Sequence, residues 1–259
     1  MTRYAITFGE VAILHVGSTQ LGKKRKNGYY IDELINIQQN ISNSEIIYLH
    51  HKLPEQYRDD NQAAVLVIRD AANLFLGTNG ADKLLQEQNN INYDKKYFDY
   101  RRKKTLNKRA RYNIVFGKQE VLHSDDYKTF SIKSFQNVPY LNLIKTKLHT
   151  FFGNKAKNLN AEGNYYFEKK SGIGFHGDAE RKIVICMSLG NTSTLRYAWR
   201  LPSSSEHYGE SIDIQVNHGD MYIMSEKATG FDWKSRSKVR VVHAAGSDKY
   251  IVKKLILNI

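Results

Sequence analysis

Apolar and polar positions alternate in short runs over the second half of the chain, and this pattern predicts strands. The runs are rich in β-branched and aromatic side chains and are separated by Gly, Asn, Ser and Asp, which are typical of turns. A longer apolar stretch at residues 139–152 instead predicts a helix. Many short strands at such spacing indicate an antiparallel sandwich or barrel. The predicted strands cover residues 112–116, 183–189, 194–199, 212–216, 221–224, 239–243 and 250–259.

The first 90 residues mix strand and helix patterns. Continuous apolar runs predict strands, and apolar residues three and four positions apart predict helices. On these criteria the strands lie at residues 4–8, 11–16 and 63–69, and the helices lie at 30–41, 71–76 and 80–85. We therefore expect an N-terminal α+β extension of unknown role at residues 1–90 and a strand-rich domain at residues 91–259.

Residues 95–112 form a basic and aromatic tract without a long apolar period, which places them on the surface. The whole chain carries 39 Lys and Arg against 26 Asp and Glu, a formal net charge of +13. A basic surface attracts polyanions, because binding releases their condensed counterions. Nucleic acid, either DNA or RNA, is therefore the expected partner. The alternative is that the lysines only solvate the surface.

The sequence has no run that approaches the roughly eighteen apolar residues of a membrane helix, and its N-terminus lacks a signal-peptide pattern. We therefore expect an intracellular protein, cytoplasmic or nuclear, without a membrane span. The single cysteine, Cys186, excludes an internal disulfide, and its apolar neighbours are typical of a buried strand. The sequence does not indicate an oligomeric state.

The segment around His176 and Asp178 gives the most specific chemical signal in the sequence. Side chains two positions apart in a strand share a face, so this imidazole and carboxylate would point the same way. One distal histidine would complete a facial triad, which leaves metal coordination positions open. His243 ends an apolar run and precedes small residues, whereas His218 lies at a turn and His207 in a loop. We therefore prefer His243 as the third ligand; the alternative for it is a structural strand histidine.

These residues belong to an ordered series that resembles the AlkB-like branch of the iron(II)- and 2-oxoglutarate-dependent oxygenases. The likeness covers roughly residues 105–259. It implies a double-stranded β-helix (jelly-roll) core with flanking helices, preceded by the N-terminal α+β extension. The series runs through Asn164-Tyr165-Tyr166, Ile173-Gly174, His176-Gly177-Asp178 with Glu180-Arg181, Met187-Ser188-Leu189-Gly190, His218-Gly219-Asp220-Met221 with Met224, and His243.

The resemblance implies that iron(II) binds to His176, Asp178 and His243, and that the co-substrate 2-oxoglutarate contacts Asn164 and Tyr166. An amide and a phenol can donate hydrogen bonds to carboxylate oxygens. The alternative for these two residues is a turn asparagine and a core tyrosine. With dioxygen, a site of this kind oxidises a C–H bond of the substrate while 2-oxoglutarate is converted to succinate and carbon dioxide.

The chain departs from the family pattern at the cation that binds the far carboxylate of 2-oxoglutarate. AlkB relatives place an arginine after the distal histidine, and this sequence has no arginine beyond Arg240. Some other members of the superfamily use a lysine there instead. Lys253 occupies the matching offset and is preferred, with Lys254 close behind. A lysine can neutralise a carboxylate as a point charge but cannot grip it as a planar fork.

The resemblance also implies a nucleic-acid base as the substrate, because AlkB-like proteins carry a nucleotide-recognition lid upstream of the barrel, where the tract at 95–112 lies. Cations there could bind phosphates, and aromatic rings could stack on bases. Glu180 and Arg181 resemble a pair that surrounds the base in some relatives, although they could equally form a surface ion pair. A long loop before His243 is a further candidate for substrate contact. The candidate substrate residues are Arg109, Arg111, Tyr112, Glu180, Arg181, Asp232, Trp233 and Lys234.

Three functions are therefore compatible with the sequence. The first is demethylation or hydroxylation of a nucleic-acid base, which must leave its stack to be reached. The second is hydroxylation of a protein side chain by the same site. The third is a catalytically idle barrel that binds nucleic acid through its basic surface. The presence of all three candidate metal ligands favours an enzyme over the third function.

Overall fold

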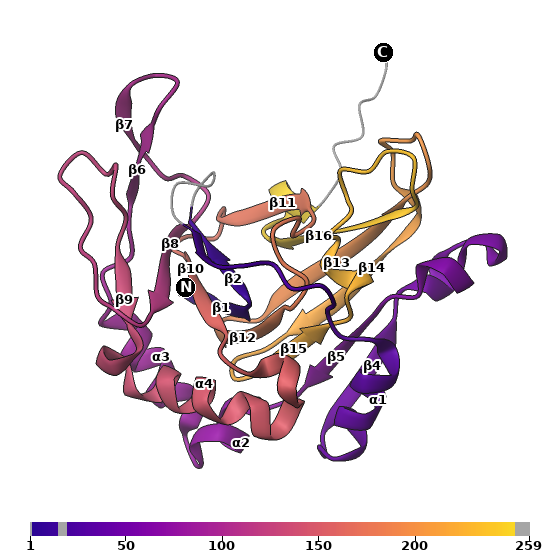
Figure 1. Cartoon of the computed structure of the whole chain (residues 1–259), viewed down its shortest axis with the longest axis horizontal. Coiled ribbons are helices and arrows are strands. Elements are labelled where there is room, and N and C mark those ends of the chain that lie inside the picture. The colour runs from indigo at the N-terminus through magenta and orange to yellow at the C-terminus, as the bar shows by residue number, and fades with distance from the viewer. Residues whose placement is uncertain (1, 15–19, 252–259) are drawn as a thin grey trace.

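The computed structural model describes residues 2–14 and 20–251, and within them the protein has a mixed α+β fold dominated by strands (Figure 1). Eight of the described strands form one sheet and four form another. The larger sheet has the order β4 (Ser44–Tyr48), β5 (Ala64–Ile68), β15 (Met221–Met224), β12 (Ile185–Gly190), β1 (Arg3–Gly9), β10 (Asn160–Tyr166), β8 (Tyr112–Gly117) and β9 (Ile132–Ser134). The smaller sheet has the order β11 (Gly172–His176), β16 (Arg240–Gly246), β13 (Ser193–Arg200) and β14 (Tyr208–Val216).

Helices cover the outer face of the larger sheet and share one hydrophobic core with it (Figure 1). Their buried side chains recur three and four positions apart, as Leu141, Ile144 and Leu148 do in α4, so each helix turns one apolar stripe to the sheet. No helix within the described residues is long and apolar enough to cross a membrane. The helices over the larger sheet are α1 (Ile31–Gln39), α2 (Ala71–Leu76), α3 (Gly80–Asn89) and α4 (Pro139–Phe152). The short α5 (Asp248–Ile251) instead lies against β11 and β16 of the smaller sheet. There are 3-10 turns at His50–Lys52, Glu55–Tyr57, Asp59–Asn61, Phe135–Asn137, Asn154–Ala156 and Lys227–Thr229.

A second hydrophobic core lies between the two sheets. Tyr197 and Trp199 of β13 are fully buried there, against Val65 and Val67 of β5. The indole nitrogen of Trp199 donates a hydrogen bond of 2.9 Å to the carbonyl oxygen of Leu49, so the buried polar group is satisfied. This core holds the sheets face to face and leaves the space beside it for a cavity.

Strand β1 separates these two environments by its alternation. Tyr4, Ile6 and Phe8 are buried in the core beneath the helices. Arg3 and Thr7, on the opposite face, point toward the smaller sheet and line the cavity between the sheets. Because side chains alternate across a strand, one short segment supplies apolar residues to the core and polar residues to the cavity.

Most elements predicted from the apolar pattern are confirmed. The predicted strands from residue 112 to residue 243 correspond to β8, β12, β13, β14, β15 and β16, and the predicted helix at 139–152 is α4. The strand predicted at residues 250–259 is wrong where it can be compared, because Tyr250 and Ile251 lie in the helix α5. The remainder of that segment lies outside the described residues.

Residues 1–90 and residues 91–259 share the larger sheet. Strand β1 pairs with both β10 and β12, and β5 pairs with β15. The boundary expected at residue 90 therefore does not separate two sheets. Pairings between strands more than 150 residues apart in sequence cannot be deduced from local pattern, because they depend on tertiary packing.

Two small hairpins complete the fold. Strands β2 (Val11–Ile13) and β3 (Gln20–Gly22) pair next to β1, and β6 (Lys96–Asp99) pairs with β7 (Lys104–Asn107). The β6–β7 hairpin projects from the body of the molecule at the upper left of Figure 1. It lies within the basic tract at 95–112, which was predicted to lie on the surface. Its turn residues 100–103 are exposed.

Candidate metal centre and adjoining cavity

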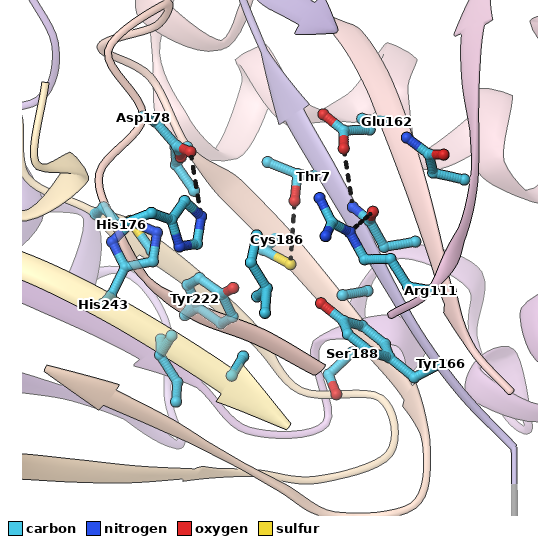
Figure 2. A pocket seen from close by; sticks show the side chains of 18 of the residues that line it. Thr7, Arg111, Glu162, Tyr166, His176, Asp178, Cys186, Ser188, Tyr222 and His243 are labelled. Atoms are coloured by element: carbon cyan, nitrogen blue, oxygen red, sulfur yellow. Dashed lines mark hydrogen bonds and ion pairs between the residues drawn. The ribbon is translucent and has the colours of Figure 1, made fainter. Parts of the chain in front are cut away.

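Three potential metal ligands meet in the space between the two sheets (Figure 2). His176 is the last residue of β11, and Asp178 follows two positions later. His243 lies on β16 directly opposite His176. One potential ligand atom from each residue lies within 4.8 Å of the other two. The fold thus brings together the two imidazoles and the carboxylate that were predicted to form a facial triad.

A backbone contact orients the ring of His176. Its Nδ1 atom lies 2.8 Å from the carbonyl oxygen of Gly174, a geometry that suits a proton on Nδ1 donated to that oxygen. The other ring nitrogen, Nε2, then carries a lone pair and lies 3.9 Å from a carboxylate oxygen of Asp178. Metal-binding histidines are commonly held by a hydrogen bond from the nitrogen that does not bind the metal.

His243 is buried, and its ring centroid lies 4.5 Å from that of His176. Burial, followed by the effects of His176 and Arg181, lowers the pKa of His243 well below its usual range. The imidazole is therefore neutral, which is the form that binds metals. Its Nδ1 atom has no hydrogen-bond partner among the described residues, and a buried polar atom without a partner is costly. A metal ion is a partner that fits the triad.

Gly177, between two of the ligands, is in close contact with the loop that precedes β16. A side chain at this position would place its Cβ 2.2 Å from the carbonyl oxygen of Gly230 and 2.8 Å from Cδ1 of Trp233. The backbone nitrogen of Asp178 donates a hydrogen bond of 2.8 Å to the carbonyl oxygen of Thr229. The loop therefore positions Asp178 through the backbone, and only glycine permits this approach.

The other two histidines considered as distal ligands lie elsewhere. His218 accepts a hydrogen bond of 2.9 Å from the backbone nitrogen of Gly190, and its other ring nitrogen lies 3.3 Å from Asp82. The ring of His207 packs against Phe175 at 4.3 Å. Among the described residues, the triad is the one group of three His, Cys, Asp or Glu side chains close enough to hold a metal.

A cavity of about 450 Å³ adjoins the triad. Figure 2 shows the triad on one side of Cys186, and Tyr166 and Ser188 on the other. Cys186 is a buried free thiol on β12, as the sequence predicted for a strand position. The neighbouring strands β10, β1 and β12 form one wall, in which Arg3 lies beside Tyr166, Ala5 lies between Asn164 and Ser188, and Thr7 lies between Glu162 and Cys186.

Asn164 and Tyr166, the two residues that the resemblance assigned to 2-oxoglutarate, both line this cavity. The amide of Asn164 is already engaged at both ends. It donates to Glu162 at 3.1 Å and accepts from Nε of Arg111 at 2.5 Å. The hydroxyl of Tyr166 points into the cavity and makes no hydrogen bond with the described residues (Figure 2). Tyr166 is thus the more available donor of the two.

A buried ion cluster forms the part of the cavity next to Asp178. Arg181 is 4% exposed and lies 2.9 Å from a carboxylate oxygen of Glu162 and 2.8 Å from one of Glu180. The pair Glu180 and Arg181 is therefore not a surface ion pair. Glu180 lines the cavity and retains access to it, whereas Arg181 is enclosed by carboxylates.

The basic candidates Arg109 and Arg111 line a second, larger hollow beside β6 and β7, which we call the hairpin groove. The hairpin groove has a volume of about 640 Å³, and no carboxylate is among its lining residues. Arg111 and Asn113 line both hollows, so the hairpin groove adjoins the cavity. Tyr112 lines neither, because its ring stacks on Phe167 at 4.1 Å. The cations of the hairpin groove are Lys96, Arg102, Lys108, Arg109 and Arg111.

The three loop candidates Asp232, Trp233 and Lys234 do not line the cavity. Asp232 is buried and accepts a hydrogen bond of 2.8 Å from the ammonium group of Lys227. Trp233 packs against Gly177, and Lys234 is exposed. Their observed contacts support the loop that holds Asp178.

Several residues that line the cavity were missed by sequence reasoning, among them Arg3, Ser188 and Glu162. Arg3 and Ser188 both face it, on the neighbouring strands β1 and β12. The polar, small, polar alternation of Arg3, Ala5 and Thr7 within an otherwise apolar run was the available signal. The lysines expected to bind the co-substrate, Lys253 and Lys254, lie outside the described residues.

Comparison with known proteins identifies a viral relative. No family model matches the chain. The chain is 40% identical over 254 residues to "Uncharacterized protein R156" of Acanthamoeba polyphaga mimivirus, and the match covers 95% of this chain and 96% of that protein. The chain therefore belongs to the same family as this mimivirus protein.

Proposed function

We propose that this member of the mimivirus protein's family is an iron(II)- and 2-oxoglutarate-dependent oxygenase of the AlkB-like kind, and that it oxidises a nucleic-acid base. The observation that carries the proposal is the meeting of His176, Asp178 and His243 beside a polar cavity. Two imidazoles and one carboxylate on facing strands are the donor set of non-haem iron oxygenases that keep coordination positions open.

The path of the chain supports a double-stranded β-helix core. Strands β10, β11, β12 and β13 alternate between the larger and the smaller sheet, and β14, β15 and β16 alternate again. A chain that winds back and forth between two facing sheets is the arrangement of a jelly roll. In such a core, residues of the smaller sheet can face the space between the sheets, as His176 at the end of β11 and His243 in the middle of β16 do.

The ligand residues are held ready for a metal by their surroundings. His176 is oriented by Gly174, Asp178 by Thr229, and His243 is kept neutral by burial. When bound there, iron(II) would supply the activation of dioxygen that couples oxidation of 2-oxoglutarate to oxidation of a substrate C–H bond. The chain itself contributes the alignment of the ligands and a wall that limits access of water.

The remaining polar groups of the cavity suit a carboxylic acid and a base. The Tyr166 hydroxyl can donate a hydrogen bond to a carboxylate oxygen, and Asn164 can do so if it exchanges its bond to Glu162. Glu180 can accept a hydrogen bond from the exocyclic amine of a base, while Arg181 holds it in place. These roles divide the cavity between co-substrate and substrate.

The hairpin groove favours a nucleic acid over a peptide as the substrate. Its lining is cationic and carries no carboxylate, so it attracts a polyanion along its length. Arg111 connects the hairpin groove to the cavity. Phosphates bound in the groove would therefore place a base that has left its stack near the triad.

The test is production of succinate from 2-oxoglutarate by the protein loaded with iron(II), measured with panels of methylated single-stranded DNA, methylated RNA and peptides. We expect an oligonucleotide to stimulate succinate formation and to be oxidised itself. Asp178→Ala should abolish both. Stimulation by a peptide alone would replace the proposal with protein hydroxylation, and failure to consume 2-oxoglutarate under any condition would replace it with a binding function.

A further inference from the structure

The part of the cavity that lies away from the triad contains an arginine that strand pairing places there. Arg3 lies on β1 directly opposite Tyr166 of β10 and opposite Gly190 of β12. Its guanidinium carbon lies 3.8 Å from the centroid of the Tyr166 ring. This cation–π contact holds the guanidinium group against the wall of the cavity.

Arg3 differs from the other cations of the cavity in that its side chain makes no hydrogen bond or ion pair with the described residues. Arg181 is enclosed by Glu162 and Glu180, and Arg111 donates its Nε proton to Asn164. No carboxylate pairs with Arg3 within residues 2–14 and 20–251. A guanidinium group at a cavity wall without such a partner is suited to bind an anionic ligand.

Two hydroxyl groups lie at the same part of the cavity. Ser188 sits on β12 two positions before the residue that pairs with Arg3, and the Tyr166 hydroxyl points into the cavity (Figure 2). Both side chains lie beyond Cys186 when viewed from the triad (Figure 2). A ligand bound at the triad by one end would therefore extend past Cys186 toward Arg3, Tyr166 and Ser188.

We propose that Arg3 binds the far carboxylate of 2-oxoglutarate, with the hydroxyls of Tyr166 and Ser188 as additional donors. The inference rests on the proposed oxygenase function and identifies which cation of this chain binds the co-substrate. The family resemblance places the cation on the chain after the distal histidine, whereas Arg3 is on the first strand, 240 positions before His243. The first strand thus completes the co-substrate site, and no lysine after His243 is needed for it.

A planar guanidinium can hold both oxygens of a carboxylate, whereas an amide or an ammonium group cannot do so in the same way. The proposed role of Arg3 therefore predicts different effects on the binding of two ligands. 2-Oxoglutarate carries the far carboxylate, and pyruvate carries the same keto acid end without it. Substitution of Arg3 should affect the first ligand and spare the second.

The experiment measures binding by titration calorimetry to the full chain loaded with Mn(II), in which no turnover takes place. Loss of one partner of an enclosed charge pair commonly costs about 2 kcal/mol or more, so Arg3→Gln should bind 2-oxoglutarate at least about 30-fold more weakly than the wild type. Pyruvate affinity and Mn(II) affinity should stay unchanged. Arg3→Lys, which keeps the charge, should restore part of the lost affinity.

The matched control is Arg236→Gln, because Arg236 is exposed and lies outside the cavity. It should behave as the wild type does. The inference is overturned if Arg3→Gln binds 2-oxoglutarate as the wild type does, or if Arg111→Gln removes the preference for 2-oxoglutarate while Arg3→Gln keeps it. If the wild type with Mn(II) binds neither ligand, the oxygenase function itself fails.

Discussion

The cavity between the sheets and the hairpin groove both gather positive charge, but they hold it in opposite ways. In the cavity, Arg181 is 4% exposed and lies between two carboxylates. In the hairpin groove, Arg102 and Arg109 are exposed and no carboxylate is among the lining residues. The charged side chains of the cavity are therefore held in place by strand register and ion pairs. The exposed arginines of the groove are long side chains that no buried ion pair holds in one position.

This difference matches the ligands proposed for each region. A metal ion and a small dicarboxylate require groups held within narrow limits, and buried strands provide them. A polymer presents a phosphate at every step, so its binding depends on the number of nearby cations more than on the placement of any one. Substitutions should consequently have large, local effects in the cavity and small, cumulative effects in the groove.

The largest effect should follow from loss of a metal ligand. We expect His176→Ala to lower turnover of 2-oxoglutarate by more than about 1,000-fold, because the proposed iron(II) would contribute several kcal/mol to the reaction and would lose one of its imidazole ligands. Binding of Mn(II), measured by calorimetry or electron paramagnetic resonance, should weaken in parallel. Oligonucleotide binding through the groove should persist.

The control for this prediction is His149→Ala, since His149 is exposed on the outer helix α4. It should leave Mn(II) affinity and turnover unchanged. Unchanged Mn(II) affinity in His176→Ala would show that the triad does not bind the metal. The contrast between a precisely arranged cavity and a loosely arranged hairpin groove would then no longer be supported.

The strand-rich half of the protein could be predicted from the sequence because its pattern is local. Alternation and turn residues identified β12, β13 and β16, and the placement of His243 near small residues favoured it over His218. These inferences use contacts within a few residues. The hydrophobic period also identified α4, whose buried residues recur three and four positions apart.

The end of the cavity proposed to bind the co-substrate could not be predicted because it depends on long-range pairing. Arg3 reaches the cavity only because β1 lies between β10 and β12, whose residues follow it by more than 150 positions. The same limit explains why the sequence alone could not place β1, β4 and β5 of the N-terminal extension in the larger sheet. Likewise, the loop candidate Asp232 could not be recognised as a partner of Lys227 from composition alone.

The next largest effect should come from the buried ion cluster of the cavity. Arg181→Met would leave Glu162, which is 5% exposed, as a buried carboxylate without a cationic partner. Removal of one member of a buried pair costs about 3 to 5 kcal/mol, so the free energy of unfolding should fall by that amount in denaturant titrations.

An exposed ion pair of the smaller sheet provides the matched control. Arg196 pairs with Asp213 at 2.5 Å, and its side chain is 23% exposed beside an Asp213 side chain that is 38% exposed. Arg196→Met should cost about 1 kcal/mol or less, because solvent screens the pair. Equal costs for the two variants would contradict the view that the cavity holds its charges more rigidly than the surface does.

A smaller effect is expected in the hairpin groove. The double substitution Arg102→Gln and Arg109→Gln should weaken binding of a single-stranded oligonucleotide by about tenfold at moderate salt. The slope of log affinity against log salt should become shallower by about 1.4, since each lost phosphate contact contributes about 0.7 for single strands. Fluorescence anisotropy across a salt series measures both quantities.

The control for the groove uses two other cations of the same hairpin. Arg101 and Lys103 are exposed in the turn but do not line the groove. Replacing both with glutamine should change affinity and slope less than the first double variant does. Equal losses would mean that the whole basic surface binds nucleic acid, with no preferred track.

The smallest effect concerns the pH dependence of oligonucleotide binding. It arises at a buried cation of the groove. Lys108 is 6% exposed, and burial lowers its pKa to about 8, with Asp94 and Glu162 opposing the shift and Arg111 adding to it. The charged ammonium form binds phosphate, so oligonucleotide affinity should fall a few-fold as pH rises from 7 to 9. Lys108→Met should flatten this pH dependence. Lys96→Gln, at an exposed position of the same groove, should lower the affinity but leave its pH dependence unchanged. A pH dependence that survives in Lys108→Met would show that the buried lysine does not contact the polymer, and that the groove binds through its exposed cations alone.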